Sequence, residues 1–361
     1  MSFSCGIVGL PNVGKTTLFN ALCRLQAAVG EYPFTTIERN VGVVPVPDDR
    51  LQAVARIVGS ARLTPATVKV VDIAGLVEGA SRGEGLGNRF LAHVREVDAI
   101  LHVVRCFTRP DVPHTTGDVD PVRDVELVET ELLLADLEVV ERRRDKVATL
   151  AKAHRTAHRE ELAALEELRA WLAAGRAARD WPGPCQVLQP LNLITRKPVV
   201  YVANVDEWAG QSAGRPEQAL RELARARGAG YVPVSARIEA EFAELEHDEE
   251  EALRAEMGLG RSQTVALVRE AYRILNLVTF FTANRNEATA WSVPVGTPVV
   301  RAAGKVHSDM ERGFIRAEVV RAEDLIRAGS LQAARQQGLV RIEGREYQVQ
   351  DGDVIYFRFA A

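Results

Sequence analysis

The segment GLPNVGKT, residues 9–16, fits the phosphate-binding pattern G-x-x-x-x-G-K-[ST]. An apolar run precedes it and a helical pattern follows it, which is the setting in which backbone N–H groups bind phosphates. There Lys15 reaches the β- and γ-phosphates and Thr16 is a ligand of Mg²⁺. A chance match in an ordinary loop is the alternative, and the strand–loop–helix setting argues against it. We therefore expect the nucleotide at Asn12, Val13, Gly14, Lys15, Thr16 and Thr17.

A second segment, VVDIAGL, places Asp72 at the end of another apolar run. A carboxylate there can hold magnesium through a water molecule, and the N–H of Gly75 can meet the γ-phosphate during catalysis. Between the two segments, PFTTIE offers Thr36 or Thr35 as a further metal ligand, with Thr36 preferred because Ile-Glu follows it. A Thr-rich turn without a ligand is the alternative. Together the segments favour hydrolysis of a nucleotide over simple binding.

The tetrapeptide NVDE, residues 204–207, bears on which base is bound. In GTPases the sequence Asn-Lys-x-Asp stands at this place, and its Asp accepts two hydrogen bonds from guanine. Here Val205 replaces the Lys, and Glu207 is one methylene longer than Asp. We therefore expect ATP to be preferred to GTP. The alternative is a GTPase with a degenerate base-recognition motif, in which Glu207 still accepts from guanine after a small backbone shift.

The elements that must position these residues follow from five apolar runs, which predict strands at Cys5–Gly9, Val68–Asp72, Ala99–Arg105, Pro198–Ala203 and Tyr231–Ser235. Helical patterns lie between the runs, as expected of a mainly parallel sheet covered by helices. The fold class is therefore α/β. The carboxyl ends of parallel strands meet at one edge, so the phosphate loop and NVDE should lie together.

Two further regions differ in amino-acid composition and spacing from the segments that predict the sheet. Between Val122 and about Arg179, Leu, Ala, Glu and Arg dominate with helical spacing, which predicts two long helices forming an antiparallel arm. From Thr279 to Phe359 the chain is rich in predicted strands, with a turn pair Asp-Gly at 351–352. We expect this tail to be a separate small α+β domain.

The composition describes an ordinary soluble protein of 361 residues, 47% hydrophobic and 26% charged. Its formal net charge of −4 provides no global attraction to nucleic acid, so contact with RNA would need local patches. Four scattered cysteines without a C-x-x-C pair suit a reducing cytosol. We find neither a signal segment nor a membrane-spanning stretch, and we expect a cytoplasmic protein that does not bind membranes.

Taken together, these motifs resemble a known family. GLPNVGKTTLFNAL, YPFTTIERNVG, DIAGLVEGASRGEGLGNRFL and LHVVRCF resemble the Obg branch of translation-factor-class P-loop GTPases. With NVDE, the helical arm and the tail WSVPVGTPVVRAAGKVHSDMERGFIRAEVV, the chain resembles the YchF-type Obg-like ATPases over almost its whole length. One departure is Arg39, where that family usually carries Pro.

The resemblance implies three domains. Residues 1–121 and 195–277 would form the nucleotide-binding G domain, 122–194 an inserted coiled-coil-like arm, and 278–361 a TGS domain of ubiquitin-like β-grasp shape. It also implies a cytosolic ATPase that acts as a slow molecular switch. Its expected partners are ATP and the ribosome, through the large subunit, or another RNA-containing partner. We expect a monomer. A nucleotide-gated adaptor with incidental hydrolysis, whose tail is the working surface, is the alternative.

The resemblance also assigns roles within the site. Leu76 stands where many GTPases carry the Gln that orients the attacking water, so hydrolysis should be slow. His114 is the implied substitute, although a lone loop histidine can equally be a solvated residue. Asn12 is similar to the Asn that binds K⁺ in cation-activated relatives. The expected base-binding residues are Phe107, Asn204, the backbone of Val205, Glu207 and Ser235.

Overall fold

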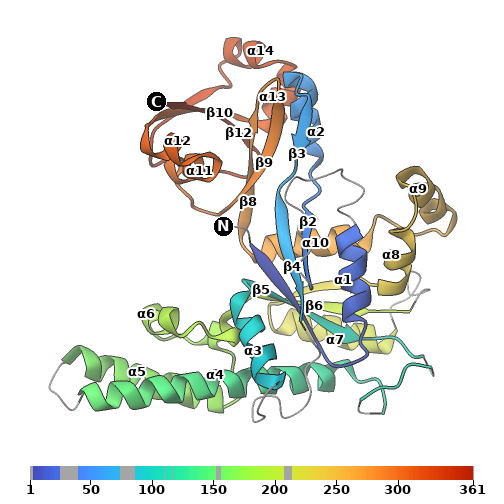
Figure 1. Ribbon diagram of the computed structural model, residues 1–361, viewed down its shortest axis with the longest axis vertical. Helices are drawn as coiled ribbons and strands as arrows, with labels where there is room; N and C mark the ends of the chain where they lie inside the picture. The colour runs from blue at the N-terminus through green and yellow to red at the C-terminus, as the bar shows by residue number, and fades with distance from the viewer. Residues whose placement is uncertain are drawn as a thin grey trace. The chain divides into compact units, whose positions relative to one another are not determined.

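The computed structural model describes residues 3–24, 40–73, 86–109, 111–115, 117–151, 156–206 and 214–360 (Figure 1). The chain divides into two compact units. The first unit contains Met1–Val44 and Lys69–Ile274, and the second contains Pro45–Val68 and Leu275–Ala361.

The first unit is built on a six-stranded sheet in the order β2-β4-β1-β5-β6-β7. All the residues of β5 and β6 are buried, as expected of central strands covered by helices on both faces. Each adjacent pair from β4 to β7 is parallel, as predicted. The strands are β1 (Ser4–Val8), β2 (Val41–Pro45), β4 (Thr67–Asp72), β5 (Ala99–Arg105), β6 (Val199–Asn204) and β7 (Gly230–Val234).

Helices cover both faces of this sheet (Figure 1). On one face lie α1 (Lys15–Arg24), α8 (Ala236–Phe242) and α10 (Gln263–Ile274). On the other lie α3 (Leu86–Glu96), α7 (Arg215–Ala226) and the beginning of α4 (Pro121–Ala151). The α/β class with a mainly parallel sheet is therefore confirmed. A further helix, α9 (His247–Glu256), precedes α10.

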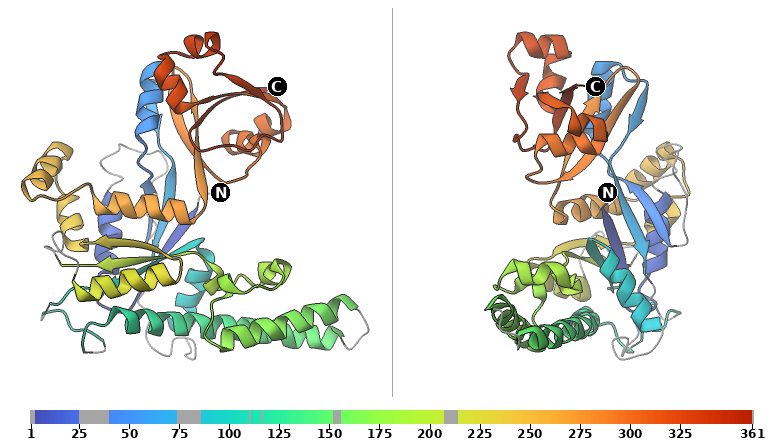
Figure 2. Two further views of the ribbon diagram at one scale, coloured as in Figure 1. Left: turned by 180° about the vertical axis from the view of Figure 1, so that it is seen from behind. Right: turned by 60° about the vertical axis from the view of Figure 1, so that its left-hand side comes forward.

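The predicted arm consists of α4 and α5 (Thr156–Ala173), which run side by side in opposite directions (Figures 1 and 2). Their facing residues form a core that includes Val140, Leu165 and Leu168. Short helices then return the chain to β6: η2 (Ala178–Asp180), α6 (Cys185–Leu188), η3 (Gln189–Leu191) and η4 (Ile194–Arg196).

The base of the arm is joined to the first unit by buried polar contacts. Asp136 of α4 is fully buried, and its carboxylate accepts hydrogen bonds from the backbone N–H groups of Ile194 and Thr195 at 2.9 and 2.7 Å. The Thr195 hydroxyl donates to the same carboxylate at 2.8 Å, and Arg95 of α3 pairs with it at 3.3 Å. The arm is thus part of the first compact unit rather than a separate body.

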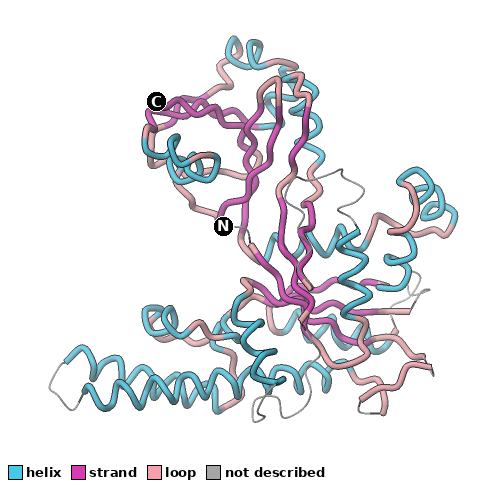
Figure 3. Tube along the Cα trace, in the orientation of Figure 1, coloured by secondary structure: helices cyan, strands magenta, loops and turns pink. Residues whose placement is uncertain are grey.

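The second unit contains a six-stranded sheet in the order β11-β10-β12-β8-β9-β3. Figure 3 shows the strands in magenta. An antiparallel β8–β9 hairpin, a crossing helix α11 and a closing β12 parallel to β8 give the predicted β-grasp arrangement. Its strands are β3 (Arg62–Thr64), β8 (Leu277–Ala283), β9 (Glu287–Pro294), β10 (Phe314–Arg321), β11 (Arg341–Glu343) and β12 (Asp353–Phe359). Its helices are α2 (Asp49–Val58), α11 (Val299–Val306), α12 (Ser308–Arg312), α13 (Ala322–Ala328) and α14 (Leu331–Gln336).

The two compact units also differ from the expected domain boundaries near the beginning of the chain. Residues 45–68 were expected in the G domain, but they belong to the second unit. The reason is that β3 extends the second sheet by parallel pairing with β9, and α2 packs beside it. Arg50 of α2 also donates to Asp351 at 2.7 Å and lies over the ring of Phe281.

None of the helices in the described part of the chain combines the length and apolar character that a membrane crossing requires.

Candidate functional site

The phosphate loop connects β1 to α1 and has the geometry that phosphate binding requires. Asn12 has a φ of 61° and Gly14 a φ of 96°, so the backbone makes tight left-handed turns there. A Cβ at Gly14 would lie 2.3 Å from the Asn204 Nδ2 atom, which explains why only glycine fits. The loop is thus held close to the end of β6.

Lys15 is buried at the start of α1, with only 8% of its surface exposed. Its ammonium donates to the carbonyl oxygens of Gly9 and Leu10 at 3.1 and 2.7 Å. Burial lowers the pKa of Lys15 to about 8, while the nearby Asp72 carboxylate opposes that shift. The hydrogen-bond acceptors of Lys15 among the described residues are neutral carbonyls, so phosphate oxygens would add charge-assisted contacts to this buried cation.

Thr16 and Asp72 form the second part of the phosphate site. The Thr16 hydroxyl donates to Asp72 Oδ2 at 2.9 Å, so the end of β4 lies beside the start of α1. A hydroxyl and a carboxylate are the hard oxygen ligands that Mg²⁺ prefers, and Mg²⁺ typically adds phosphates and water to one or two protein ligands. No group of three His, Cys, Asp or Glu side chains suited to a metal occurs among the described residues.

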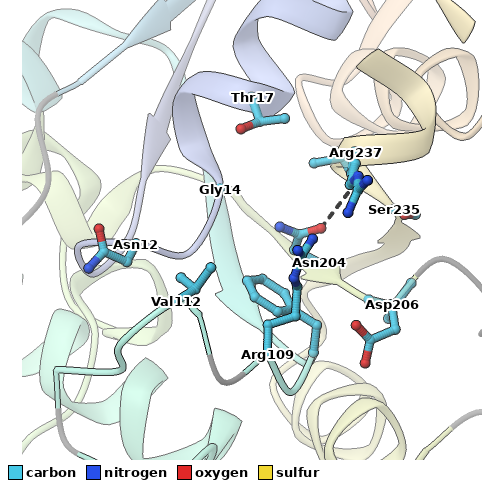
Figure 4. Close-up of a pocket in the computed structure, with 12 residues that line it drawn as sticks. Asn12, Gly14, Thr17, Arg109, Val112, Asn204, Asp206, Ser235 and Arg237 are labelled. Atoms are coloured by element: carbon cyan, nitrogen blue, oxygen red, sulfur yellow. Dashed lines mark hydrogen bonds between the residues drawn. The ribbon is translucent and has the colours of Figure 1, made fainter. Parts of the chain in front are cut away.

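Asn204 ends β6 and connects two loops of the site (Figure 4). Its amide donates to the carbonyl of Val13 at 2.8 Å, and its oxygen accepts from the N–H of Ala236 at 3.1 Å. The amide nitrogen of Asn204 keeps a second N–H donor, and its oxygen keeps a second lone pair. Asn204 therefore links the phosphate loop to the start of α8, and its direct pairing with a base stays a prediction.

A pocket of about 320 Å³ lies next to the phosphate loop (Figure 4). It is formed at the carboxyl ends of β1, β5, β6 and β7, which are neighbours in the sheet, and such an edge is where nucleotides bind in open α/β sheets. The lining residues come from the four segments that follow or end these strands: Asn12, Gly14, Thr17, Phe107, Arg109, Val112, Asn204, Val205, Asp206, Ser235, Ala236 and Arg237.

The structure brings together seven residues predicted to bind nucleotide, and they line this pocket: Asn12, Gly14, Thr17, Phe107, Asn204, Val205 and Ser235. Ser235 is buried, and its hydroxyl has no hydrogen-bond partner within the described part of the chain. Its backbone N–H donates to the side chain of Gln263 at 2.7 Å. A buried unsatisfied hydroxyl beside the pocket is available to a ligand.

His114 lies in the loop between β5 and α4, as predicted, but its side chain is not solvated. The side chain is only 4% exposed, and Nε2 is 2.9 Å from the carboxylate of Asp124 in the first turn of α4. Burial raises the pKa of the Asp124 carboxyl, while His114 opposes that shift. The preceding residue, Pro113, accepts a hydrogen bond from Asn12 at 3.4 Å, so this loop borders the phosphate loop.

Several residues considered at the sequence level lie outside the described residues: Thr36, Arg39, Gly75, Leu76 and Glu207. Thr35, the alternative metal ligand, is also outside them.

Sequence reasoning missed several residues of the pocket. Arg109 and Val112 belong to the loop after β5, and Ala236 and Arg237 follow β7. Asp206 lies within NVDE and accepts a hydrogen bond from the N–H of Thr108 at 3.2 Å. Their place in the sequence could have identified them, because each follows the carboxyl end of a parallel strand.

Two known protein families match the N-terminal and C-terminal parts of the chain. Residues 4–151 match a family described as a 50S ribosome-binding GTPase. Residues 277–360 match YchF-GTPase_C, described as a protein of unknown function (DUF933). Along its whole length the chain is similar to the ribosome-binding ATPase YchF of Bacillus subtilis, with 46% identity over 99% of this chain and 100% of that protein. The chain belongs to the YchF family.

Other YchF proteins show the same full-length similarity. The ribosome-binding ATPase YchF of Escherichia coli O157:H7 is 45% identical over 99% of both chains. Among solved structures, the YchF GTPase of Schizosaccharomyces pombe superposes with a TM-score of 0.90 at 31% identity, covering 99% of this chain and 98% of that one. A GTP binding protein from Pyrococcus horikoshii, at 21% identity and a TM-score of 0.63, shares the fold.

Proposed function

We propose that this chain is a ribosome-binding ATPase, a P-loop enzyme that hydrolyses ATP as a regulatory switch. The proposal rests on one observation: a phosphate site and a pocket large enough for a base lie next to each other at one edge of the sheet. Lys15, Thr16 and Asp72 supply the phosphate and magnesium contacts, and the loops after β5, β6 and β7 enclose the adjoining pocket. The names of the YchF relatives support both the ATPase activity and the ribosome as partner.

The proposed chemistry uses few protein groups. P-loop enzymes of this type generally use Mg²⁺, which would be held by Thr16 and by Asp72 through water, with Thr36 as a further ligand. Lys15 binds the β- and γ-phosphate oxygens and stabilises the charge that develops there. His114 orients or polarises the attacking water in place of a Gln, and the N–H of Gly75 contacts the γ-phosphate. K⁺ bound by Asn12 would add a second cation.

The position of the His114 loop beside the phosphate loop supports a catalytic role for His114, whereas the contact of its side chain with Asp124 does not. The imidazole is paired with Asp124, and the loop is bonded to Asn12 of the phosphate loop. The proposed role requires His114 to leave Asp124 before its imidazole can reach the phosphates. Such a step before chemistry fits slow hydrolysis in a switch.

ATP is the proposed nucleotide, and a GTPase is the second candidate. The side chain of Asn204 is engaged with Val13 and Ala236. That contact holds the loops together whichever base is bound. The S. pombe relative is named a GTPase, which favours the second candidate. Because Val205 and Glu207 alter the guanine motif, we expect ATP to bind more tightly than GTP by roughly tenfold or more.

A direct competition titration of the purified protein, with labelled ATP displaced by ATP or GTP, decides between the two nucleotides. Equal displacement by GTP would replace the ATPase by a GTPase. Turnover measured with and without ribosomes then tests the switch: stimulation supports it, and an unchanged rate with bound ribosomes favours a nucleotide-gated adaptor. We propose a monomeric, cytoplasmic protein that contacts the large ribosomal subunit, and sedimentation of ribosomal subunits with the protein tests that contact.

A further inference from the structure

Arg105 is a buried cation at the end of an apolar strand. It is the last residue of β5, and only 3% of its surface is exposed. A guanidinium carries five N–H donors and stays charged, so its burial is costly unless those donors find acceptors. Arg105 finds them in the loop that follows its own strand.

Four carbonyl oxygens of that loop accept hydrogen bonds from Arg105. Its Nε donates to Phe107 at 3.2 Å, and one terminal nitrogen donates to Arg109 and Val112 at 3.3 and 2.9 Å. The other terminal nitrogen donates to Pro113 at 3.4 Å. Because the guanidinium is planar and rigid, it fixes the four carbonyls relative to one another.

The guanidinium also fixes an aromatic ring. The Arg105 carbon Cζ lies 4.4 Å from the centre of the Phe107 ring, within the range of a cation–π contact. One side chain therefore sets both the path of the loop and the placement of its aromatic residue.

The loop held by Arg105 forms one wall of the pocket. Phe107, Arg109 and Val112 all line it. The wall is tied to its neighbours at two points: Thr108 donates to Asp206 after β6, and Pro113 accepts from Asn12 of the phosphate loop. Arg105 itself does not line the pocket.

We infer that Arg105 is a positioning residue that builds the base-binding wall of the pocket and thereby strengthens binding of the base, without touching the nucleotide. This inference rests on the proposed function, because it takes the pocket to be the base site. Its effect should be confined to the base end of the ligand, since the phosphate loop has its own support from Asn204.

The test compares two ligands on variant Arg105→Lys. Lysine keeps the positive charge but loses the planar fork, so it cannot hold four carbonyls in one arrangement. Isothermal titration in the presence of Mg²⁺ measures the affinity for ATP and for inorganic tripolyphosphate, which has phosphates but no base. We expect ATP to bind about tenfold or more weakly, because the wall is no longer pre-organised, and tripolyphosphate to bind as in the wild type.

Arg95→Lys is the matched control. Arg95 also donates to backbone carbonyls, those of Ala135 and Asn192, but it lies at the base of the arm. We expect this control to leave the affinities for both ligands unchanged, even where its thermal midpoint falls. Arg105→Gln, which removes the charge and keeps a short donor, is the second variant and should resemble Arg105→Lys.

Each outcome is decisive. Unchanged ATP affinity in a folded Arg105→Lys protein would overturn the inference, and so would an equal loss for ATP and tripolyphosphate. If neither Arg105 variant reaches the folded state, as judged by circular dichroism, Arg105 is a determinant of folding and the inference is overturned. If the wild-type protein binds ATP and GTP no more tightly than tripolyphosphate, the base contributes no affinity and the proposed function is refuted instead.

Discussion

Two buried charged side chains of the first unit use backbone partners in opposite ways. Arg105 at the end of β5 donates to four carbonyls of a single loop, whereas Asp136 in α4 accepts from two N–H groups and a hydroxyl of a distant segment. The cation holds the loop that forms one wall of the pocket, and the carboxylate joins the arm to η4 and α3. By our proposal, similar chemistry therefore supports nucleotide binding at Arg105 and stability at Asp136.

Burial and charge alone do not identify a functional residue. Asp136 is completely buried, and Lys15 and Arg105 nearly so. What separates them is the segment their partners belong to: Arg105 and Lys15 contact loops that border the pocket, and Asp136 contacts the short helices that lead back to β6. Changes at the first two should alter ligand binding or turnover, and a change at the third should alter the free energy of unfolding.

The largest effect is expected at the base of the arm. Asp136→Ala leaves two backbone N–H groups and Arg95 without their buried acceptor, so we expect it to reduce the free energy of unfolding by about 3–5 kcal/mol. Urea denaturation measures this loss. The control Glu138→Ala, which removes an exposed i,i+4 pair with Arg142, should cost less than about 0.5 kcal/mol. A comparable loss in both variants would contradict the anchoring role.

At the phosphate site the expected effect is on catalysis. Lys15→Ala removes the buried ammonium that would meet the β- and γ-phosphates, so we expect kcat/KM for ATP to fall by about 10²–10³-fold. The control Lys69→Ala changes an exposed lysine of the same sheet and should leave turnover unchanged. Wild-type turnover in Lys15→Ala would remove this residue from the phosphate site.

His114→Ala should act on the chemical step alone. If the imidazole reaches the γ-phosphate or its water, we expect single-turnover hydrolysis to slow by about 10²-fold while ATP affinity changes little. His158→Ala, on the arm, is the control. A variant that loses affinity and rate together would instead place His114 among the residues that shape the pocket through Asp124.

The smallest effect concerns stability in acid. His102 of β5 is buried against Tyr201, and burial, with Lys15 and Arg227 nearby, lowers the pKa of His102 to about 3. Below about pH 6.5 the unfolded chain binds a proton there and the folded chain does not, so stability is lost as the pH falls toward 3.

Between pH 6.5 and 5 this loss amounts to about 2 kcal/mol for the wild type. We expect the non-titrating variant His102→Gln to be less sensitive to pH by that amount, as measured by urea denaturation at both values. His307→Gln, an exposed control, should keep the wild-type sensitivity. An unchanged pH dependence in His102→Gln would show that His102 is not held neutral.

Local signals explain what the sequence could predict. Continuous apolar runs predicted β5 and β6 closely, and the phosphate-loop pattern predicted the turn between β1 and α1. The role of Arg105 could not be predicted, because it depends on a loop folding back onto its own strand. Membership of α2 and β3 in the second sheet was likewise hidden, since β3 is three residues long and its partner β9 lies far along the chain.

That distant pairing has a consequence for biosynthesis. Leu63 of β3 pairs with Ala288 of β9, so about 220 residues must be made before the strand finds its neighbour. At a translation rate of about 5–20 residues per second, β9 is synthesised on the order of 10–40 s after β3. During that interval β3 and the apolar face of α2 lack their partners. The nascent chain thus exposes an unpaired strand near its beginning until its last quarter emerges. Shielding by a chaperone during that interval should raise the yield of correctly folded protein, and a chain cut before residue 277 should aggregate.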